Sequence, residues 1–496
     1  MVLRNAPHLV ASFVATIVAA TGCLAPDAVP GAGGAGGSGG AGGTGGSAGA
    51  PASLELAWAH AYGIDSDNDQ RAWSISLTPG RDALVAGEFR GSFTMGSLPT
   101  LPNTEGRDAF VAQLDPTGEP AWVMGFVGLG EQRVYRAIST PDGGFVVAGA
   151  FTQSLNFADA ERGDSPDGED GFIASIGDAQ NLRWLVHLAG PGTQTVNALA
   201  LSPDGDVFIA GHFDDTLALG DLIVEGDADT LDFFVARLRE DGEPLWATSL
   251  GGDPAQLDPG QPACHLVAAP DGGVHVAGTF VGTVRLDENL GAIGSRDVFV
   301  ARLDPAGVPL WGHTLGAPER SQRASALAID AQGRTLLAGD LDGDVTFDGT
   351  TLTADGDQTD AFLAVIDAKG ELAWARRYGS IAEDHADTAT FDPSGDILFA
   401  GRFRGSIAFG AEAPLLGSGA VSDDDDIFLA RLTPDGAPLL SRAFGGDGDQ
   451  VPTALAVDPE DALLLVGYFG GTLDFGDGPL DALAGDDLFA VKLEQK

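Results

Sequence analysis

Cysteine is almost absent from this sequence: the 496 residues contain two, Cys23 and Cys264. Because Cys23 belongs to the amino-terminal segment discussed below, the globular part has a single cysteine and no internal disulfide is possible. The absence of a Cys-x-x-Cys pair also excludes zinc and redox sites of that type. The fold must therefore depend on its hydrophobic core.

Basic residues are also scarce. The chain has 26 Lys and Arg against 72 Asp and Glu, which gives a formal net charge of −46. A field of this sign repels phosphate, so we expect no nucleic-acid partner. An acidic surface of this kind is typical of a protein that must stay soluble.

Long hydrophobic runs are missing too. The apolar run at 9–20 is short for a membrane span, which needs ~20 residues. It follows Arg4 and leads through small residues to Cys23, and this segment resembles a bacterial lipoprotein signal peptide, although Ala20 stands where Leu is usual. The resemblance implies cleavage after residue 22 and a lipid on Cys23. The alternative is an ordinary secretory signal with an incidental cysteine.

A flexible tether follows the predicted lipid. Residues 31–50 are Gly, Ala, Ser and Thr, with no side chain able to pack, so 23–53 should act as a spacer before a folded domain at 54–496. We expect an extracytoplasmic protein, attached to the membrane only through its lipid anchor. Leu24 is not the acidic residue that retains some lipoproteins at the inner membrane, which favours the outer membrane or cell surface.

Glycine and proline are abundant, at 72 and 28 residues, and this composition indicates many short strands joined by tight turns. The domain repeats itself, most visibly at an Asp-x-Phe step that opens an apolar strand. The seven Asp residues of this step are Asp108, Asp170, Asp232, Asp297, Asp360, Asp426 and Asp487.

Two further signatures recur with the same period. An apolar run ending in Gly-x-Phe or Gly-x-Leu precedes each step, with Gly87, Gly149, Gly211, Gly278, Gly339, Gly401 and Gly467. A strand after each step carries Trp122, Trp184, Trp246, Trp311, Trp374 or, at the seventh place, Leu440, and Trp58 begins the series. The tryptophan positions, with Leu440, recur every 62 to 66 residues, so each period is one supersecondary unit.

Each unit reads as four main antiparallel strands, such as 197–202, 206–213, 232–238 and 243–250. A shorter segment such as 216–220 predicts a small extra hairpin in the unit. A single four-stranded sheet cannot bury both faces, whereas seven sheets arranged radially cover one another.

We therefore predict an all-β, seven-bladed β-propeller. The domain begins with a fourth-type strand at 54–62 and ends with a third-type strand at 487–493. Pairing these two would complete the last blade and close the ring, which removes an exposed edge.

These units resemble the bacterial seven-bladed β-propeller repeat family found in surface lipoproteins, whose repeats read Asp-x-Phe, Asp-Pro-x-Gly, Trp and Leu-Gly-Gly. The likeness covers nearly all of 54–496, with its clearest copies at 246–252 and 443–446, and departs from the pattern at 315–317 and 378–380. It implies a secreted or surface-exposed propeller and no particular biochemical activity.

Linear catalytic motifs are absent: the chain has no Gly-x-Ser-x-Gly elbow and no His-Glu-x-x-His pair. We expect strand histidines with satisfied hydrogen bonds at His60, His187, His212, His275 and His313. Cys264 and His265 are adjacent in a strand, so their side chains should point to opposite faces. No catalytic residue is predicted.

The repeated aspartates are expected to cap loops by accepting backbone N–H bonds. Denser acidic runs occur as well, at Asp227 and Asp229 and at 423–426 among others, and alternating aspartates can supply oxygen ligands to Ca²⁺. Calcium is the one cofactor we consider, with Asp65, Asp67, Asp69, Asp355, Asp357, Asp360, Asp447 and Asp449 as candidate ligands.

The sequence thus predicts a monomeric, noncatalytic binding module for a protein or glycan. One alternative is an extracellular hydrolase or lyase whose residues converge at the channel mouth, where linear motifs would be missing. The other is a structural subunit of an envelope assembly.

Overall fold

The computed structural model divides the chain into two units, Met1–Gly49 and Ala50–Lys496. The residues described all belong to the second unit: 53–63, 69–102, 106–157, 160–227, 230–254, 264–286, 289–354, 358–410, 414–417, 424–483 and 485–495. Cys23, the predicted signal peptide and nearly all of the predicted linker lie outside these residues.

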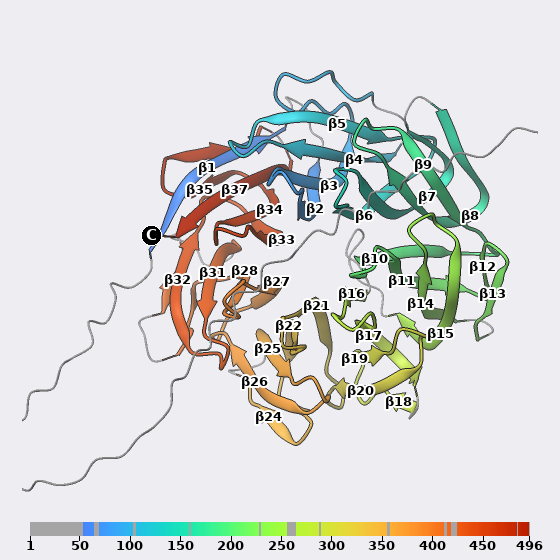
Figure 1. Cartoon of the computed structure of the whole chain (residues 1–496). Helices are drawn as coiled ribbons and strands as arrows, with labels where there is room; N and C mark the ends of the chain where they lie inside the picture. Colours follow the sequence, from blue (N-terminus) through green and yellow to red (C-terminus); the bar gives the residue numbers. More distant parts are fainter. Residues whose placement is uncertain are drawn as a thin grey trace, which may run out of the picture. The chain divides into compact units, whose positions relative to one another are not determined.

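Seven four-stranded antiparallel blades form the domain, as the repeats predict (Figure 1). The inner strands of blades 1 to 7 are β2 (Gln70–Leu77), β6 (Gln132–Ser139), β10 (Gln194–Leu201), β16 (Cys264–Ala268), β21 (Gln322–Ile329), β27 (Asp384–Phe391) and β33 (Gln450–Val457). The second strands are β3 (Ala83–Arg90), β7 (Phe145–Phe157), β11 (Val207–Asp214), β17 (Val274–Arg285), β22 (Thr335–Asp342), β28 (Ile397–Phe403) and β34 (Leu463–Phe469).

The two remaining strands of each blade lie progressively farther from the ring axis. The third strands are β4 (Arg107–Leu114), β8 (Ala160–Ile176), β14 (Leu231–Leu238), β19 (Asp297–Leu303), β25 (Thr359–Ile366), β31 (Asp426–Leu432) and β37 (Asp487–Gln495). The outer strands are β5 (Pro120–Phe126), β9 (Leu182–Leu188), β15 (Pro244–Pro254), β20 (Pro309–Leu315), β26 (Leu372–Tyr378), β32 (Pro438–Phe444) and, for blade 7, β1 (Leu54–Tyr62).

The predicted extra hairpin follows the second strand of several blades. Its strands are β12 (Thr216–Leu219) and β13 (Leu222–Glu225), β23 (Val345–Phe347) and β24 (Thr350–Leu352), β29 (Ser406–Ile407) and β30 (Leu415–Leu416), and β35 (Thr472–Asp474) and β36 (Pro479–Asp481). In blade 4 the short β18 (Asn289–Gly291) pairs with an extension of β17 instead. The end of β15 also pairs with β17, which joins blades 3 and 4 into one continuous sheet.

The ring closes as predicted. β1 pairs antiparallel with β37 in a register that runs from Leu54 opposite Gln495 to Tyr62 opposite Leu488. Each inner strand contacts the inner strand of the next blade, and β33 of blade 7 contacts β2 of blade 1. Figure 1 shows β1, in blue, beside the red β37 at this junction.

The repeated phenylalanines form the interior between blades. Each hydrophobic cluster combines side chains of neighbouring blades, as in the cluster that holds Phe89 and Phe110 of blade 1 with Val466 of blade 7. Burial of these large apolar groups is the main stabilising contribution in the absence of disulfides. The buried Phe residues of the Asp-x-Phe steps are Phe110, Phe172, Phe234, Phe299, Phe362, Phe428 and Phe489.

The repeated glycines are explained by a β-bulge in the strand beside them. In six inner strands the pairing register slips by one residue opposite the glycine, and the extra residues are Trp73, Tyr135, Asn197, Ser325, Asp387 and Thr453. The slip carries a backbone carbonyl of the inner strand against the glycine. A Cβ at Gly87 or Gly339 would lie 2.0 or 1.9 Å from such an oxygen, so only glycine fits there.

The repeated tryptophans bind one blade to the next. The indole nitrogens of Trp58, Trp184 and Trp374 donate to carbonyl oxygens in the turn between the third and outer strands of the following blade, at 2.7 to 3.0 Å. The turn glycine, such as Gly242 at φ 86°, lies directly under the ring. Its positive φ and the close ring both require glycine.

Leu440 breaks the tryptophan series for a topological reason. The blade that follows it is blade 7, whose third and outer strands are β37 and β1, from opposite ends of the domain. The turn that Trp58, Trp184 and Trp374 bind does not connect these two strands. Arg442 instead donates to the carbonyl oxygen of Leu54 at 2.5 Å, which attaches blade 6 to the closing strand.

Candidate functional site

The inner strands surround a small cavity on the ring axis. It is lined by residues from the inner strands of six blades, among them the bulge residues Trp73, Ser325, Asp387 and Thr453. The bulges thus direct polar and aromatic side chains into the channel, the usual effect of a bulge on side-chain direction. The cavity volume is about 40 Å³, enough for a few water molecules and far below the roughly 300 Å³ of a typical small-molecule site.

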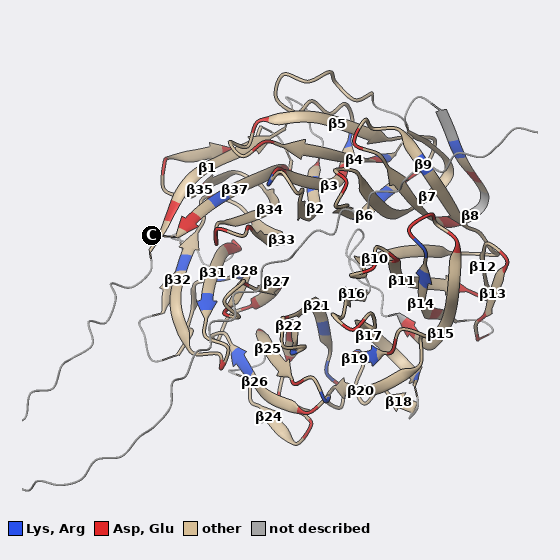
Figure 2. Ribbon diagram, viewed as in Figure 1, with Lys and Arg blue, Asp and Glu red and all other residues tan. Residues whose placement is uncertain are grey.

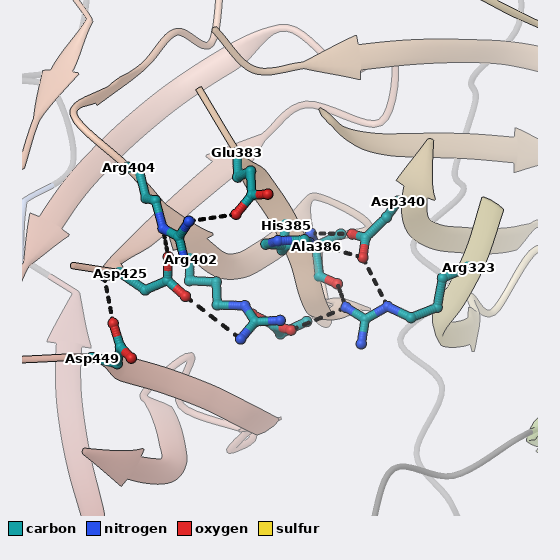
Figure 3. Close-up of polar contacts among 10 residues, drawn as sticks. Arg323, Asp340, Glu383, His385, Ala386, Arg402, Arg404, Asp425 and Asp449 are labelled. Atoms are coloured by element: carbon teal, nitrogen blue, oxygen red, sulfur yellow. Dashed lines mark hydrogen bonds and ion pairs between the residues drawn. The ribbon is translucent and has the colours of Figure 1, made fainter. Parts of the chain in front are cut away.

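An ion-pair network from blades 5 and 6, drawn in Figure 3, borders this cavity through Arg323 and Asp387. Arg323 on β21 contacts Asp340 on β22 at 2.8 Å and Asp387 on β27 at 3.3 Å. Arg402 on β28 lies 3.7 Å from Asp387 and 3.6 Å from Asp425. Asp387 therefore lies between two guanidinium groups, each of which has another carboxylate.

The network continues toward the rim of the channel. Arg404 contacts Asp425 at 2.7 Å and Glu383 at 2.5 Å. The backbone N–H of Asp425 donates to Asp449 at 3.1 Å, and this bond connects blade 6 to blade 7. We define the mouth face as the end of the propeller where the inner and third strands begin, which is the end that holds these residues.

Two buried carboxyl groups in the network differ in their pKa. Burial would raise the pKa of Asp340, but Arg323 and His385 hold it well below its usual value, helped by the backbone N–H of Ala386 at 2.9 Å. Burial raises the pKa of Asp387, because the opposing Arg402 and Arg323 do not fully compensate for lost hydration.

Charged residues extend around the mouth into blades 7, 1 and 2. The guanidinium of Arg71 lies 4.7 Å from the centre of the Tyr468 ring and 2.6 Å from Asp486. Arg107 pairs with the buried Glu88, and Arg133 pairs with Glu169 at 2.9 Å. Figure 2 shows most other acidic residues in the loops between strands. The mouth therefore presents paired, fixed charges.

The calcium candidates are dispersed over the structure. Asp65, Asp67, Asp355 and Asp357 lie outside the described residues, as does Asp229 of the other acidic runs. Asp69 lies 3.8 Å from Arg71, Asp360 pairs with Arg377 at 2.9 Å, and Asp449 accepts the bond from Asp425. The N–H of Asp447 donates to Thr472 at 2.8 Å. Across the described ranges, no three His, Cys, Asp or Glu side chains are grouped to hold a metal ion; calcium binding stays a prediction.

The capping role of the repeated aspartates is confirmed in several blades. Asp108, Asp232 and Asp487 accept backbone N–H bonds at 3.2, 2.6 and 2.8 Å. In two other blades the aspartate contacts a side chain: Asp170 lies 2.7 Å from His187, and Asp360 pairs with Arg377.

Most of these histidines have hydrogen-bond partners, as expected, but the Nε2 of the buried His275 has none among the described residues. His60 and His313 contact turn carbonyls of the next blade, whereas His212 contacts Thr195 and Asn197. The buried His275 lies 2.8 Å from the hydroxyl of Thr335. Among the described residues, no serine or cysteine is hydrogen-bonded to a histidine, so the pair needed for the usual nucleophile activation is not seen there.

Cys264 and His265 face opposite sides of their strand, as predicted. Cys264 is buried in the core between blades 3 and 4, and burial raises the pKa of its thiol to about 12. His265 lines the axial cavity. A reactive thiolate pair is therefore not formed.

A glutamine that we did not predict begins most inner strands. The amide of Gln132 donates to the carbonyls of Leu129 and Ser154 at 2.8 and 2.9 Å and so holds the mouth loops. Its recurrence with the repeat period was the available signal. The buried members of this set are Gln70, Gln132, Gln194, Gln322 and Gln450.

In blade 6 the glutamine is replaced by Asp384. This buried carboxylate accepts the backbone N–H of Ser380 at 2.6 Å. Burial raises its pKa to about 7, and the nearby Asp360 contributes in the same direction. Asp384 is thus a carboxyl group in a position that elsewhere holds a neutral amide.

Comparison with known proteins agrees with this architecture. The WD40 family (WD domain, G-beta repeat) matches residues 183–219, which run from the outer strand of blade 2 into blade 3. The chain is a β-propeller with WD40-like repeats.

Two curated relatives match part of the chain. Regulatory protein FlaEY of Caulobacter vibrioides is 28% identical over 163 residues, which cover 31% of this chain and 16% of FlaEY. The WD repeat-containing protein L264 of Acanthamoeba polyphaga mimivirus is 20% identical over 366 residues, or 61% of this chain and 26% of that protein. The chain spans about a quarter or less of the length of these relatives.

Several solved structures are similar to this chain at low sequence identity. A protein from Dyadobacter fermentans has a TM-score of 0.40 at 11% identity, covering 89% of this chain and 99% of its own. Sqt1 from Chaetomium thermophilum has a TM-score of 0.38 at 14% identity, covering 90% of this chain and 100% of its own. The PQQ-bound aldose sugar dehydrogenase of Streptomyces coelicolor has a TM-score of 0.37 at 13% identity, covering 90% of this chain and 98% of its own. None of the activities in these names is carried over to this chain.

In the described part of the chain, no helix is both long and apolar enough to cross a membrane.

Proposed function

We propose that this propeller is a noncatalytic binding module that uses its mouth face to hold a protein or glycan. The observation that carries the proposal is a set of exposed apolar side chains at that face. Leu129 and Ile381 lie in loops that lead from an outer strand to the next inner strand, and Ile293 and Leu483 precede third strands. Their exposed fractions range from 55% to 79%.

Exposed apolar side chains surrounded by polar residues are typical of a surface that a partner covers on binding. The loops that carry them are fixed from below. The N–H of Leu483 donates to the buried Asp487 at 2.8 Å, and Gln132 holds the carbonyl of Leu129. A preorganised rim loses less entropy on binding than a mobile one. The arginines beneath it are each paired with at least one carboxylate, an arrangement that favours binding over acid–base chemistry.

The location of the module is part of the proposal. A lipid on Cys23 and the glycine-rich spacer would hold the propeller outside the cytoplasm, at the outer membrane or cell surface. The support comes from the sequence, because 23–52 lie outside the described residues. Several acyl chains on one residue give stable anchoring, whereas one chain alone does not.

The test is binding of the chain to an array of glycans and envelope proteins, with and without millimolar Ca²⁺. Ile381→Asp and Leu129→Asp should abolish each hit of the unmodified chain. Val308→Asp is the matched control, because Val308 is also 55% exposed but lies in a turn at the opposite end of the blades. Equal loss in the control variant would contradict a mouth-face site.

Calcium has its own readout in the same experiment. A hit that requires Ca²⁺ would support the acidic-loop prediction, and identical hits in both arms would argue against it. If the chain binds nothing on the array, the hydrolase or envelope-assembly alternatives are favoured instead. Stable co-purification of one partner after detergent extraction would then favour the assembly.

A further inference from the structure

One cation on the ring axis has no anionic partner among the described residues. Arg136 follows the bulge of β6 and lines the axial cavity together with Trp73, His265 and Ser325. Its Nη1 donates to the carbonyl oxygens of Trp73 at 2.9 Å and Tyr135 at 3.1 Å. Within the described ranges, no carboxylate lies at ion-pair distance from this guanidinium.

The other arginines of the axis differ from Arg136 in this respect. Arg71, Arg323 and Arg402 each lie within 4 Å of at least one carboxylate. Arg136 keeps the donors of Nε and Nη2, for which the described residues provide no acceptor. Arg136 is half-buried, and partial loss of hydration without a counter-charge is costly for a cation. This desolvation lowers the pKa of Arg136 to about 10, so the group still carries its charge at neutral pH.

Neighbouring groups do not neutralise this charge. The Cys264 thiol has a pKa raised to about 12 by burial, so it is not a thiolate. Burial, followed by the fields of Arg136 and Arg323, lowers the pKa of His265 to about 3. Asp387 lines the same cavity, but its carboxylate is shared between Arg323 and Arg402. The side of the cavity that holds Arg136 and the neutral His265 therefore stays electropositive, although the whole chain is strongly acidic.

The cavity also offers a second donor. The Ser325 hydroxyl is buried and has no hydrogen-bond partner, and Ser325 lines the same cavity as Arg136. With a volume of about 40 Å³, the space holds a monatomic anion with a water molecule and excludes larger metabolites.

We propose that the axial cavity binds one small monovalent inorganic anion of chloride size, with the Arg136 guanidinium and the Ser325 hydroxyl as donors. The anion supplies the missing counter-charge through charge-assisted hydrogen bonds. It would hold the inner strands of blades 2 and 5 together across the axis. This site is separate from the partner surface proposed for the mouth face, so either can fail without the other.

The first experiment measures thermal unfolding of the full chain in sodium chloride and in sodium isethionate of equal ionic strength. The isethionate anion is too large for the cavity, so the comparison removes general salt effects. A ligand that binds only the folded state stabilises it by mass action, and we expect a Tm about 1–3 °C higher in chloride. Arg136→Gln should lose this difference.

The matched control is Arg183→Gln, which removes an arginine paired with Asp142 at 2.6 Å in a partly exposed turn. This variant should keep the chloride response. A chloride response of the same size in Arg136→Gln would overturn the proposal.

A second measurement does not depend on the variant folding. Crystals of the unmodified protein soaked in sodium bromide should show an anomalous peak in contact with Arg136 and Ser325. Bromide sites elsewhere with none in the axial cavity would overturn the proposal. Crystals of Arg136→Lys, which keeps the positive charge, should retain the peak at lower occupancy.

Discussion

The indole Nε1 of Trp246 in blade 3 donates a hydrogen bond of 3.0 Å to the carbonyl oxygen of Pro305 in blade 4. The same ring covers Gly307, where an added Cβ would lie 2.9 Å from the indole. One residue thus fixes the position of the next blade by a hydrogen bond and by contact.

This relationship predicts a coupling between the two positions. Trp246→Phe should cost about 1 kcal/mol, since it keeps most of the ring and loses the hydrogen bond. Gly307→Ala should cost more, because the new methyl meets the ring and the φ of +82° strains any side chain. In the Trp246→Ala background the clash is relieved, so the double variant should lose less than the two single losses added, measured by chemical denaturation. Additive losses would contradict direct contact.

Ring closure can be tested at the first strand. Deleting Leu54–Tyr62 removes β1, the outer strand of blade 7, and exposes the edge of β37. The deletion should lower the unfolding temperature of the whole domain in one transition, because the inner strands contact one another around the ring. Calorimetry that showed an unchanged transition would rule out closure as a source of stability.

Asp384 should make stability depend on pH. Its folded pKa of about 7 exceeds the ordinary value of 3.8. Between about pH 4 and 7 the folded state therefore binds this proton more strongly than the unfolded state does. The free energy of unfolding is highest below about pH 4 and decreases as the pH rises toward 7. Asp384→Asn removes this dependence and should be more stable than the unmodified chain at pH 8, by up to about 4 kcal/mol.

The control for that experiment is Asp435→Asn, a change at an exposed turn position. Denaturation curves at pH 4.5 and 8 should separate from those of the unmodified chain for Asp384→Asn and coincide for Asp435→Asn. A gap that shrinks with rising pH would reverse the sign and refute the assignment.

Asp340 and Asp387 share Arg323, yet their substitution should have opposite effects. Asp340→Asn removes a carboxylate that the fold stabilises and leaves Arg323 underneutralised, which should cost about 3 kcal/mol at pH 7. Asp387→Asn removes a carboxylate whose burial is incompletely compensated, so it should be nearly neutral or stabilising. Equal losses in urea denaturation would show that the two carboxylates are equivalent.

If Cys23 carries the proposed lipid, Cys23→Ala should release the protein from membranes. The thiol is the only attachment point for the predicted diacylglyceryl group, and the chain should then fractionate with soluble proteins after cell lysis. Cys264→Ala, at a buried core position, is the control and should remain with membranes. Membrane association of Cys23→Ala would contradict lipidation.

The sequence by itself determined the number of blades, the strand order within each blade and the pairing of Leu54–Tyr62 with the last strand. This was possible because every blade has the same local packing requirements. A recurring Asp-x-Phe step marks a buried strand start, and a recurring glycine such as Gly87 marks a backbone approach that no side chain tolerates. Because these local requirements recur in every blade, they appear as a repeated pattern in the amino-acid sequence.

Only the tertiary structure decided which side chains of different blades meet at the ring axis. Asp387 and Arg402 lie in one blade and Arg323 in another, and a bulge in each of the two inner strands β21 and β27 determines which of their side chains reach the axis. A bulge depends on the pairing of two strands, so no local pattern in the inner strand reveals it. The unneutralised charge of Arg136 likewise follows from the contacts of several blades around it, since an ion pair depends on distances in space that the repeat period does not record.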